Sequence, residues 1–245
     1  MADYTAYFNG NWVPFSQVKI DPLDRGFLVG DVVFDVARTF NGKSFRMKEH
    51  VERLYRSLKY ARIDSGLSLD EMIDASEEII KRNEHLRDEA GDFTIAQFIT
   101  RGKGRAYDAG PPTVCVKIGT IDFSRYAEQY ETGMNGVITR TRSYSPEALD
   151  PKVKHLSRLN MSLAELEAND LDPGAWPILT DMNGNLTSLP GRVLSYNFKN
   201  LLNHLDRENG STVDYSYDYK NRLTRKLVSD NGTETDTKML GNYAE

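Results

Sequence analysis

Residues with reactive side chains are few and widely spaced in this sequence. The four histidines, His50, His85, His155 and His204, lack the spacing that metal ligands adopt, so no zinc site is expected. The single cysteine, Cys115, lies in the apolar alternating run TVCVKIG, which is typical of a buried strand residue. The GKG within RGKGRAYDAGPP is too short for a phosphate-binding glycine fingerprint. Spacing alone therefore nominates no metal, thiol or nucleotide chemistry.

The composition narrows the classes of partner. The 245 residues carry 31 Lys and Arg against 36 Asp and Glu, a net charge of −5, which gives no general attraction for nucleic acid or anionic membranes. No run approaches the roughly 18 consecutive apolar residues of a membrane span, and the start, MADYTAYFNGNW, lacks a secretory signal's features. The chain is long enough to bury a core and carry a pocket. We therefore expect a cytoplasmic protein without nucleic acid or membrane partners.

Strand and helix signals are mixed in residues 1–120. A hairpin is expected at residues 4–15 around Asn9-Gly10, a dipeptide that tolerates the positive φ angles of a type I′ turn. A helix is expected at residues 49–63, where apolar residues recur at helical spacing. Another begins at Ser68, where Glu71 completes a capping box. Further strands are predicted at residues 32–40, 93–100 and 113–119.

A second unit is expected after residue 121. Its signals are a strand at residues 137–141, a helix at 160–169, and a strand pair at 176–187 that turns at Asn183-Gly184. The predicted fold class is therefore α/β (α+β), with a small N-terminal α/β domain at residues 1–120 and a second domain at 121–191.

The sequence beyond residue 191 has a different texture. An offset of 21 aligns SYNFKNLL, residues 195–202, with SYDYKNRL, residues 216–223, at five identities in eight positions. Aromatic and polar residues alternate and Gly-containing turns follow, which predicts short β-hairpin repeats at residues 192–245. The block YSYDYKNRLT resembles the YD repeat of Rhs-type surface and toxin-shell proteins. Repeat units need neighbours to bury their faces, and this tail has only two copies. A poorly ordered tail is therefore one of the outcomes that the sequence leaves open.

Three motifs occur in order along the first 190 residues. They are DRGFLVGDVVFDV at 24–36, EHVERLYRS at 49–57, and PKVKHLSRLNMSLAELEAND at 151–170 with ILTDMNGNLTS at 178–188. Together they resemble the class IV, fold-type IV aminotransferases, the group of branched-chain, D-amino-acid and R-selective amine transaminases. The resemblance implies a homodimer that holds pyridoxal 5′-phosphate between a small N-terminal and a larger C-terminal domain. Family members continue well beyond residue 191, so residues 121–191 would be a truncated cofactor-binding domain.

The resemblance implies roles for two basic residues. Lys154, in Val153-Lys154-His155-Leu156, would be the Schiff-base lysine, through whose aldimine an amino group moves between an amino acid or amine and a 2-oxo acid. Lys152 is the alternative if the register is shifted. Arg53 in the helix motif would bind the cofactor phosphate, for which a guanidinium is well suited. We expect Lys154 and Arg53 to face a common cavity.

Further positions follow from the same resemblance. Phe34 and Arg38 would line the substrate pocket, although core packing accounts for Phe34 equally well. Arg105 lies near the arginine that binds the substrate carboxylate in D-amino-acid members. Ser188 stands where the family has a glutamate that pairs with the ring nitrogen. A hydroxyl can hydrogen-bond a neutral nitrogen but does not stabilise a pyridinium, which would cost roughly ten- to a hundredfold in rate.

Other functions remain open at this point. An aminodeoxychorismate lyase-like reaction uses the same fold and cofactor. A catalytically silent, chimeric or truncated aminotransferase-like protein would keep part of the fold and lack a complete cofactor site. A surface repeat module would account only for the tail. The sequence does not identify the substrate.

Overall fold

The computed structural model describes residues 3–87, 91–121, 124–145, 147–181, 188–189, 192–196, 201–207, 209–217, 223–230 and 232–238. The chain divides into two compact units. The first consists of Met1–Gly133 with Lys152–Arg158, and the second of Met134–Pro151 with Leu159–Glu245. The short segment that carries Lys154 therefore belongs to the first unit. The division at residues 120 and 191 stays a prediction.

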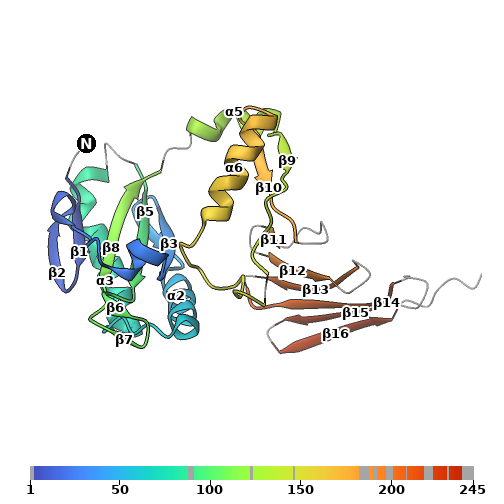
Figure 1. Cartoon of the computed structure of the whole chain (residues 1–245), viewed down its shortest axis with the longest axis horizontal. Coiled ribbons are helices and arrows are strands. Elements are labelled where there is room, and N and C mark those ends of the chain that lie inside the picture. Colours follow the sequence, from blue (N-terminus) through green and yellow to red (C-terminus); the bar gives the residue numbers. More distant parts are fainter. Residues whose placement is uncertain are drawn as a thin grey trace, which may run out of the picture. The chain divides into compact units, whose positions relative to one another are not determined.

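A six-stranded antiparallel sheet is the centre of the first unit (Figure 1). Its order is β2-β1-β8-β5-β3-β4. Its strands are β1 (Thr5–Phe8), β2 (Asn11–Pro14), β3 (Val32–Phe40), β4 (Lys43–Phe45), β5 (Phe93–Thr100) and β8 (Val114–Thr120). Asn9 and Gly10 join β1 to β2 with φ angles of 48° and 87°, which confirms the predicted hairpin turn. The predicted bounds of β3 and β5 are confirmed as well.

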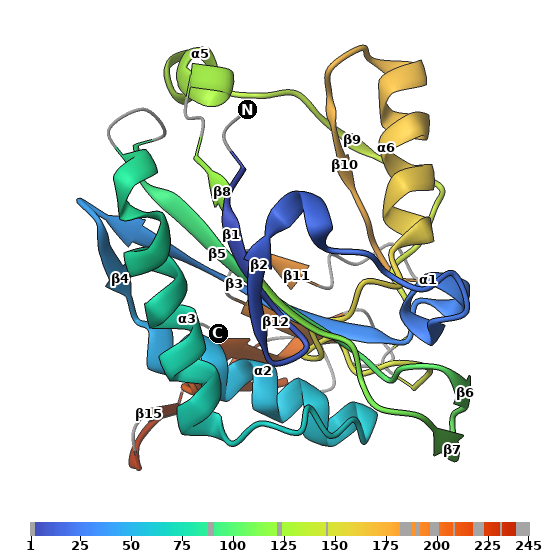
Figure 2. The same cartoon turned by 90° about the vertical axis from the view of Figure 1, so that its left-hand side faces the viewer.

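Two long helices pack against this sheet (Figure 2). The helical elements of the unit are η1 (Phe15–Gln17), α1 (Arg25–Val29), α2 (Met47–Ala61), α3 (Leu69–Asn83), η2 (Glu84–Leu86) and α5 (Ser124–Thr132). The capping box predicted at the start of α3 is present, with Ser68 and Glu71 each accepting a hydrogen bond from the other's backbone N–H. The apolar faces of both helices meet the sheet in a core that includes Val33, Leu54, Met72, Ile95 and Val116.

The side chains of β3 alternate between two environments. Val33 and Ala37 are buried in the core beneath the helices. Phe34 lies on the other face and stacks on Phe98 of β5, with ring centroids 6.1 Å apart. Because successive residues of a strand point to opposite faces, Asp35 shares the helix-covered face with Val33 and Ala37. One strand therefore presents different chemistry on its two faces.

A buried aspartate anchors the loop after β5 to the start of α1. Asp24 is 1% exposed and accepts hydrogen bonds from the hydroxyls of Thr100, at 2.8 Å, and Thr113, at 2.6 Å. Its other oxygen caps α1 by accepting from the N–H of Gly26 at 2.7 Å. The loop forms a small hairpin of β6 (Gly104–Arg105) and β7 (Asp108–Ala109). This anchor holds the DRG segment next to β3.

The second unit begins with a parallel strand pair. β9 (Gly136–Ile138) pairs with β10 (Trp176–Ile178), and α6 (Leu159–Leu171) packs against both. The helix predicted at 160–169 is confirmed, and the strand predicted at 137–141 is present but ends at Ile138. The pairing of β10 with β9 was not predicted, and the second strand of the predicted pair, which ends at residue 187, lies outside the described residues. The predicted turn at Asn183-Gly184 lies outside the described residues.

The rest of this unit is an antiparallel sheet whose strands follow chain order. They are β11 (Ser188–Leu189), β12 (Arg192–Tyr196), β13 (Leu202–Arg207), β14 (Thr212–Tyr217), β15 (Leu223–Asp230) and β16 (Thr233–Lys238). Tyr196 pairs with Leu202, and 21 residues later Tyr217 pairs with Leu223, each next to a register shift. The strand pairing therefore recurs with the period of the sequence repeat. The resemblance to YD repeats stays a prediction.

Candidate functional site

The backbone around Lys154 is fixed to two elements of the first unit. The N–H of Phe34 donates to the carbonyl of Lys154 at 2.9 Å, and the N–H of Leu156 donates to Val32 at 3.2 Å. The N–H of Lys154 donates to the hydroxyl of Ser57 on α2 at 3.1 Å. These bonds attach the segment to β3 on one side and to α2 on the other. Lys154 is half-buried, whereas Lys152 is exposed.

Two cations lie against the ring of Phe34. The Nζ of Lys154 is 5.0 Å from the ring centroid, and the guanidinium carbon of Arg158 is 5.1 Å from it. Phe34 itself is only 8% exposed. Burial lowers the pKa of Arg158, and burial followed by the charge of Arg158 lowers the pKa of His155. Lys154 and Arg158 therefore place two positive charges against one ring, and an anion would be favoured beside them.

Arg53 binds a buried carboxylate. Its Nε and Nη2 lie 2.7 and 3.0 Å from the two oxygens of Asp35, which is 0% exposed. The Nδ1 of His50 lies 2.8 Å from Asp35 Oδ1. Burial alone would raise the pKa of Asp35, but the hydrogen bonds from His50 and Arg53 outweigh it, so the pKa is lowered overall. Asp35 is therefore an ionised carboxylate bound by two side chains of α2.

The lowered pKa of Asp35 predicts a pH-dependent contribution to stability. A depressed carboxyl pKa stabilises the fold above the unfolded pKa of about 4, and this contribution is lost as the pH falls through the folded pKa. Asp35→Asn should therefore unfold at a lower temperature than the wild type at pH 7, and the difference should shrink toward pH 2. Melting temperatures of both proteins across this range test it. If the difference in melting temperature between the two proteins stayed the same down to pH 2, the ionised carboxylate of Asp35 would not be the cause of that difference.

The amine of Lys154 and the guanidinium of Arg53 contact adjacent residues of β3. Phe34 and Asp35 point to opposite faces of the strand, so the two contacts lie on different sides of it. The backbones are closer, since the hydroxyl of Ser57 accepts from the Lys154 N–H and donates to the Arg53 carbonyl at 3.2 Å. The structure brings Lys154, Phe34 and the Arg53 turn of α2 together. A cavity shared by the amine and the guanidinium stays a prediction.

The other predicted positions have separate surroundings. Arg38 is four residues beyond Phe34 on β3, with its guanidinium carbon 3.8 Å from the ring centroid of Phe40. Arg105 is exposed in the β6–β7 hairpin and donates to the hydroxyl of Tyr107 at 2.9 Å. Ser188 is in β11 of the second unit and pairs with Val193. Their proposed roles rest on the motif match.

Sequence reasoning missed three residues of this site. Asp35 had a usable signal, because a carboxylate within an apolar strand is buried only when it is paired. Ser57 lies within the helix motif and on the buried side of α2, but nothing in its spacing indicates that it binds the Lys154 backbone. Arg158 follows Lys154 by four residues outside any helix, so helical spacing does not place it at Phe34.

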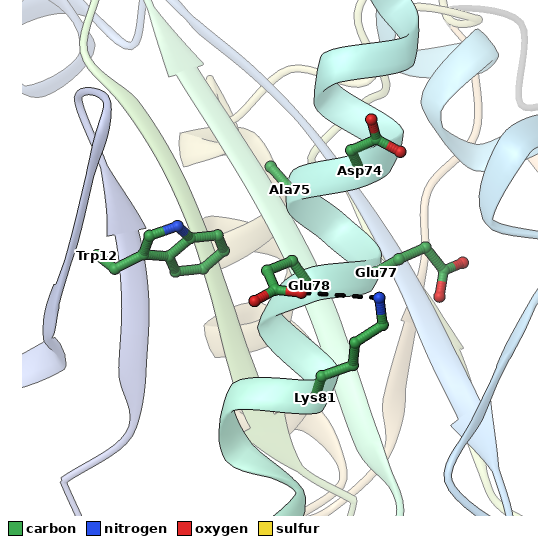
Figure 3. Close-up of a pocket in the computed structure, with 6 residues that line it drawn as sticks. All are labelled: Trp12, Asp74, Ala75, Glu77, Glu78 and Lys81. Carbon is green, nitrogen blue, oxygen red and sulfur yellow. Dashed lines mark ion pairs between the residues drawn. The ribbon is translucent and has the colours of Figure 1, made fainter.

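One cavity is found elsewhere on the first unit. It has a volume of about 420 Å³ and lies between β2 and α3, as Figure 3 shows. It is lined by Trp12, Asp74, Ala75, Glu77, Glu78 and Lys81. None of the predicted site residues lines it. Among the described residues, no group of three His, Cys, Asp or Glu side chains could hold a metal ion, and no helix is long and apolar enough to cross a membrane.

The chain belongs to the class IV aminotransferase family, whose model, described as amino-transferase class IV, matches residues 32–191. A putative branched-chain-amino-acid aminotransferase of Methanocaldococcus jannaschii is 35% identical over 168 residues, which are 66% of this chain and 55% of that protein. A D-alanine aminotransferase of Staphylococcus aureus is 32% identical over 134 residues, 54% of this chain and 46% of that protein. The chain thus spans about half the length of these curated relatives.

Solved structures show the same fold. The branched-chain amino acid aminotransferase of Escherichia coli matches with a TM-score of 0.66 and 21% identity, covering 79% of this chain and 62% of that one. The T.th. branched-chain amino acid aminotransferase with pyridoxamine 5′-phosphate matches with a TM-score of 0.64 and 22% identity, covering 80% and 63%. The chain is therefore a mixed α/β protein with aminotransferase neighbours of fold type IV.

Proposed function

We propose that this protein is a pyridoxal 5′-phosphate-dependent aminotransferase, which moves an amino group between an amino acid or amine and a 2-oxo acid. The observation that carries the proposal is the setting of Lys154 in a class IV chain. Its amine is half-buried against Phe34 beside a second cation, Arg158, and its backbone is attached to β3 and α2. A primary amine beside a second positive charge suits an anionic aldehyde, which the amine can capture.

The residues present fit this cofactor in their chemistry. When bound, pyridoxal phosphate supplies an aldehyde that captures amino groups and a ring that accepts electrons. Lys154 would hold the cofactor and move a proton at the substrate Cα. Arg53 would bind the phosphate, and Phe34 would pack against the substrate. Structures of the T.th. relative with pyridoxamine 5′-phosphate and with N-(5′-phosphopyridoxyl)-L-glutamate support the choice of cofactor.

Two arginines are candidates for the substrate carboxylate. Arg38 lies on the same face of β3 as Phe34, and Arg105 lies in the exposed β6–β7 hairpin. We propose Arg38 and Arg105 as substrate-binding residues and a homodimer as the working assembly. Relatives with branched-chain and D-alanine activities in their names both match this chain, so we propose donors from both classes for assay.

Spectroscopy with amino donors tests this function. The purified protein mixed with pyridoxal phosphate should develop a visible absorption band that free cofactor at that concentration does not show. L-leucine, D-alanine or an R-amine should then shift the band, and a 2-oxo acid should restore it. A protein that stays colourless at millimolar cofactor would contradict the proposal.

A catalytically silent protein is the second candidate, and Ser188 is the observation that favours it. Where the resemblance implies a glutamate, this chain has a hydroxyl, which supplies no negative charge to stabilise a protonated ring nitrogen. A visible band that amino donors leave unchanged would support the silent protein.

Ser188→Glu tests how much turnover this departure removes. A charge-assisted hydrogen bond is worth about 1.5–3 kcal/mol, so the variant should raise kcat by roughly ten- to a hundredfold. Single-turnover rates with a fixed donor measure the change, and Ser188→Gln, which lacks the charge, is the matched control. Equal rates for the Glu and Gln variants would show that Ser188 does not occupy the ring-nitrogen position.

A further inference from the structure

A buried carboxylate lies directly behind the arginine of the helix motif. We propose that Asp35, together with His50, is a positioning pair that orients the guanidinium of Arg53 for the phosphate of the cofactor. This inference rests on the proposed function and adds roles for two residues that the motifs contain but to which the resemblance gave no role. Its basis is the set of contacts among β3 and α2 within the first unit.

The geometry of the ion pair restricts the guanidinium. Arg53 directs two nitrogens, Nε and Nη2, at the two oxygens of Asp35, at 2.7 and 3.0 Å. A two-point contact of this kind fixes the plane of the guanidinium as well as its place. Asp35 sits on β3, next to the edge strand of the sheet, and is 0% exposed, whereas the Arg53 side chain is 23% exposed. The rigid partner therefore lies inside the fold, and the partly exposed arginine is held against it.

His50 restricts the carboxylate in turn. It lies one helical turn before Arg53 on α2, and its Nδ1 is 2.8 Å from Asp35 Oδ1. Nδ1 also lies 3.3 Å from Arg53 Nη2. Because an ionised carboxylate only accepts hydrogen bonds and the contact to Asp35 is the shorter, we infer that Nδ1 carries the proton and donates it to Asp35. The opposite tautomer would place a nitrogen lone pair against a carboxylate oxygen. Asp35 thus receives hydrogen bonds from two residues of one helix face, which fixes both of its oxygens.

Considered by its charge alone, Asp35 is expected to weaken phosphate binding at Arg53, whereas a positioning role is expected to strengthen it. A negative charge next to Arg53 partly cancels the charge that attracts phosphate, so removing it should strengthen phosphate binding if orientation were unimportant. If Asp35 acts by orienting the guanidinium, removing its charge should weaken phosphate binding. A loss of phosphate affinity on removing the Asp35 charge therefore indicates positioning, and a gain indicates that only the charge matters.

The test compares pyridoxal phosphate with pyridoxal, which lacks the phosphate. The dissociation constant of pyridoxal divided by that of pyridoxal phosphate, measured by absorption titration of the cofactor-free protein, isolates the phosphate contribution from the attachment at Lys154. In Asp35→Asn we expect the ratio to fall about tenfold, with the affinity for pyridoxal nearly unchanged. Asp31→Asn is the matched control, because Asp31 also binds two cationic side chains, Arg25 and Arg101, and it should keep the wild-type ratio.

If Asp35→Asn does not fold, two variants of His50 test the positioning role instead. His50 is on the surface of α2 and 23% exposed, so its replacement spares the core. His50→Ala should lower the ratio severalfold. His50→Asn should restore it, because the asparagine amide places a donor near the position of Nδ1. Equal ratios in both His50 variants and the wild type would overturn the positioning role.

The outcomes separate this inference from the proposed function. A wild-type protein that binds neither aldehyde would overturn both. A wild-type protein that binds both aldehydes equally would overturn the role of Arg53 and of its positioning pair, and would leave Lys154 in place. A clear preference for the phosphorylated aldehyde that persists or increases in Asp35→Asn would overturn the positioning pair alone.

Discussion

Lys154→Ala is expected to lower the transamination rate by about 10⁴-fold. The residue is proposed to serve both as the nucleophile that attaches the cofactor and as the group that moves the proton at the substrate Cα, so one substitution removes both contributions. Stability should change little, because the side chain is half-buried and the backbone hydrogen bonds to Ser57 and Phe34 remain. Initial rates with the best donor, together with the visible absorption of bound cofactor, measure the effect.

Lys152→Ala is the matched control for that substitution. Lys152 is exposed and two residues away, so its removal should leave both the rate and the absorption band within about twofold of the wild type. The reverse pattern, with the band lost in Lys152→Ala and kept in Lys154→Ala, would move the attachment site to Lys152. Retention of the band in both variants would exclude both lysines.

Gly102→Ala is expected to cause a large loss of stability. Gly102 has φ of +83°, and a Cβ built there would collide with the backbone carbonyl of Pro111. Its own carbonyl accepts from the N–H of Arg25 at 2.9 Å, so a shift would disturb the start of α1. The unfavourable φ and the clash together should lower the free energy of unfolding by about 2–5 kcal/mol.

Gly66→Ala provides the comparison for the backbone angle alone. Gly66 has φ of +71°, and nothing lies within 4 Å of an added Cβ. Its replacement should cost only about 1 kcal/mol. Urea denaturation of both variants measures the difference. Equal losses of unfolding free energy in the two variants would mean that the loop containing Gly102 can move away from Pro111 at no cost. The close contact with Pro111 would then not contribute to stability.

Local signals in the sequence were sufficient for the elements of the first unit. The Asn9-Gly10 turn, the capping box at Ser68 and the bounds of β3 each depend on a few adjacent residues, and each is confirmed. Strand pairings between segments far apart in the sequence were harder to predict. The parallel pairing of the strand at Trp176–Ile178 with β9, some 40 positions earlier, was not predicted, and the predicted partner strand ending at residue 187 lies outside the described residues. Such a pairing depends on packing with α6 rather than on local pattern.

The sequence likewise indicated some residues of the candidate site but not the contacts between them. The family resemblance pointed to Lys154 and Arg53, because each lies in a motif that matches the family. It did not indicate that Asp35 would bind Arg53, since the two come from different elements and meet only after β3 packs on α2. Nor did it place Arg158 at Phe34, because that contact depends on how an irregular segment lies along β3.

Reductive trapping tests the central claim most directly. Borohydride added to the protein with pyridoxal phosphate reduces a lysine–cofactor linkage to a stable secondary amine, which peptide mass spectrometry can locate. The account predicts one dominant modified peptide, with the cofactor on Lys154, and a loss of this modification when an amino donor is added before the reductant. Modification located on another lysine, or spread evenly over exposed lysines, would contradict it.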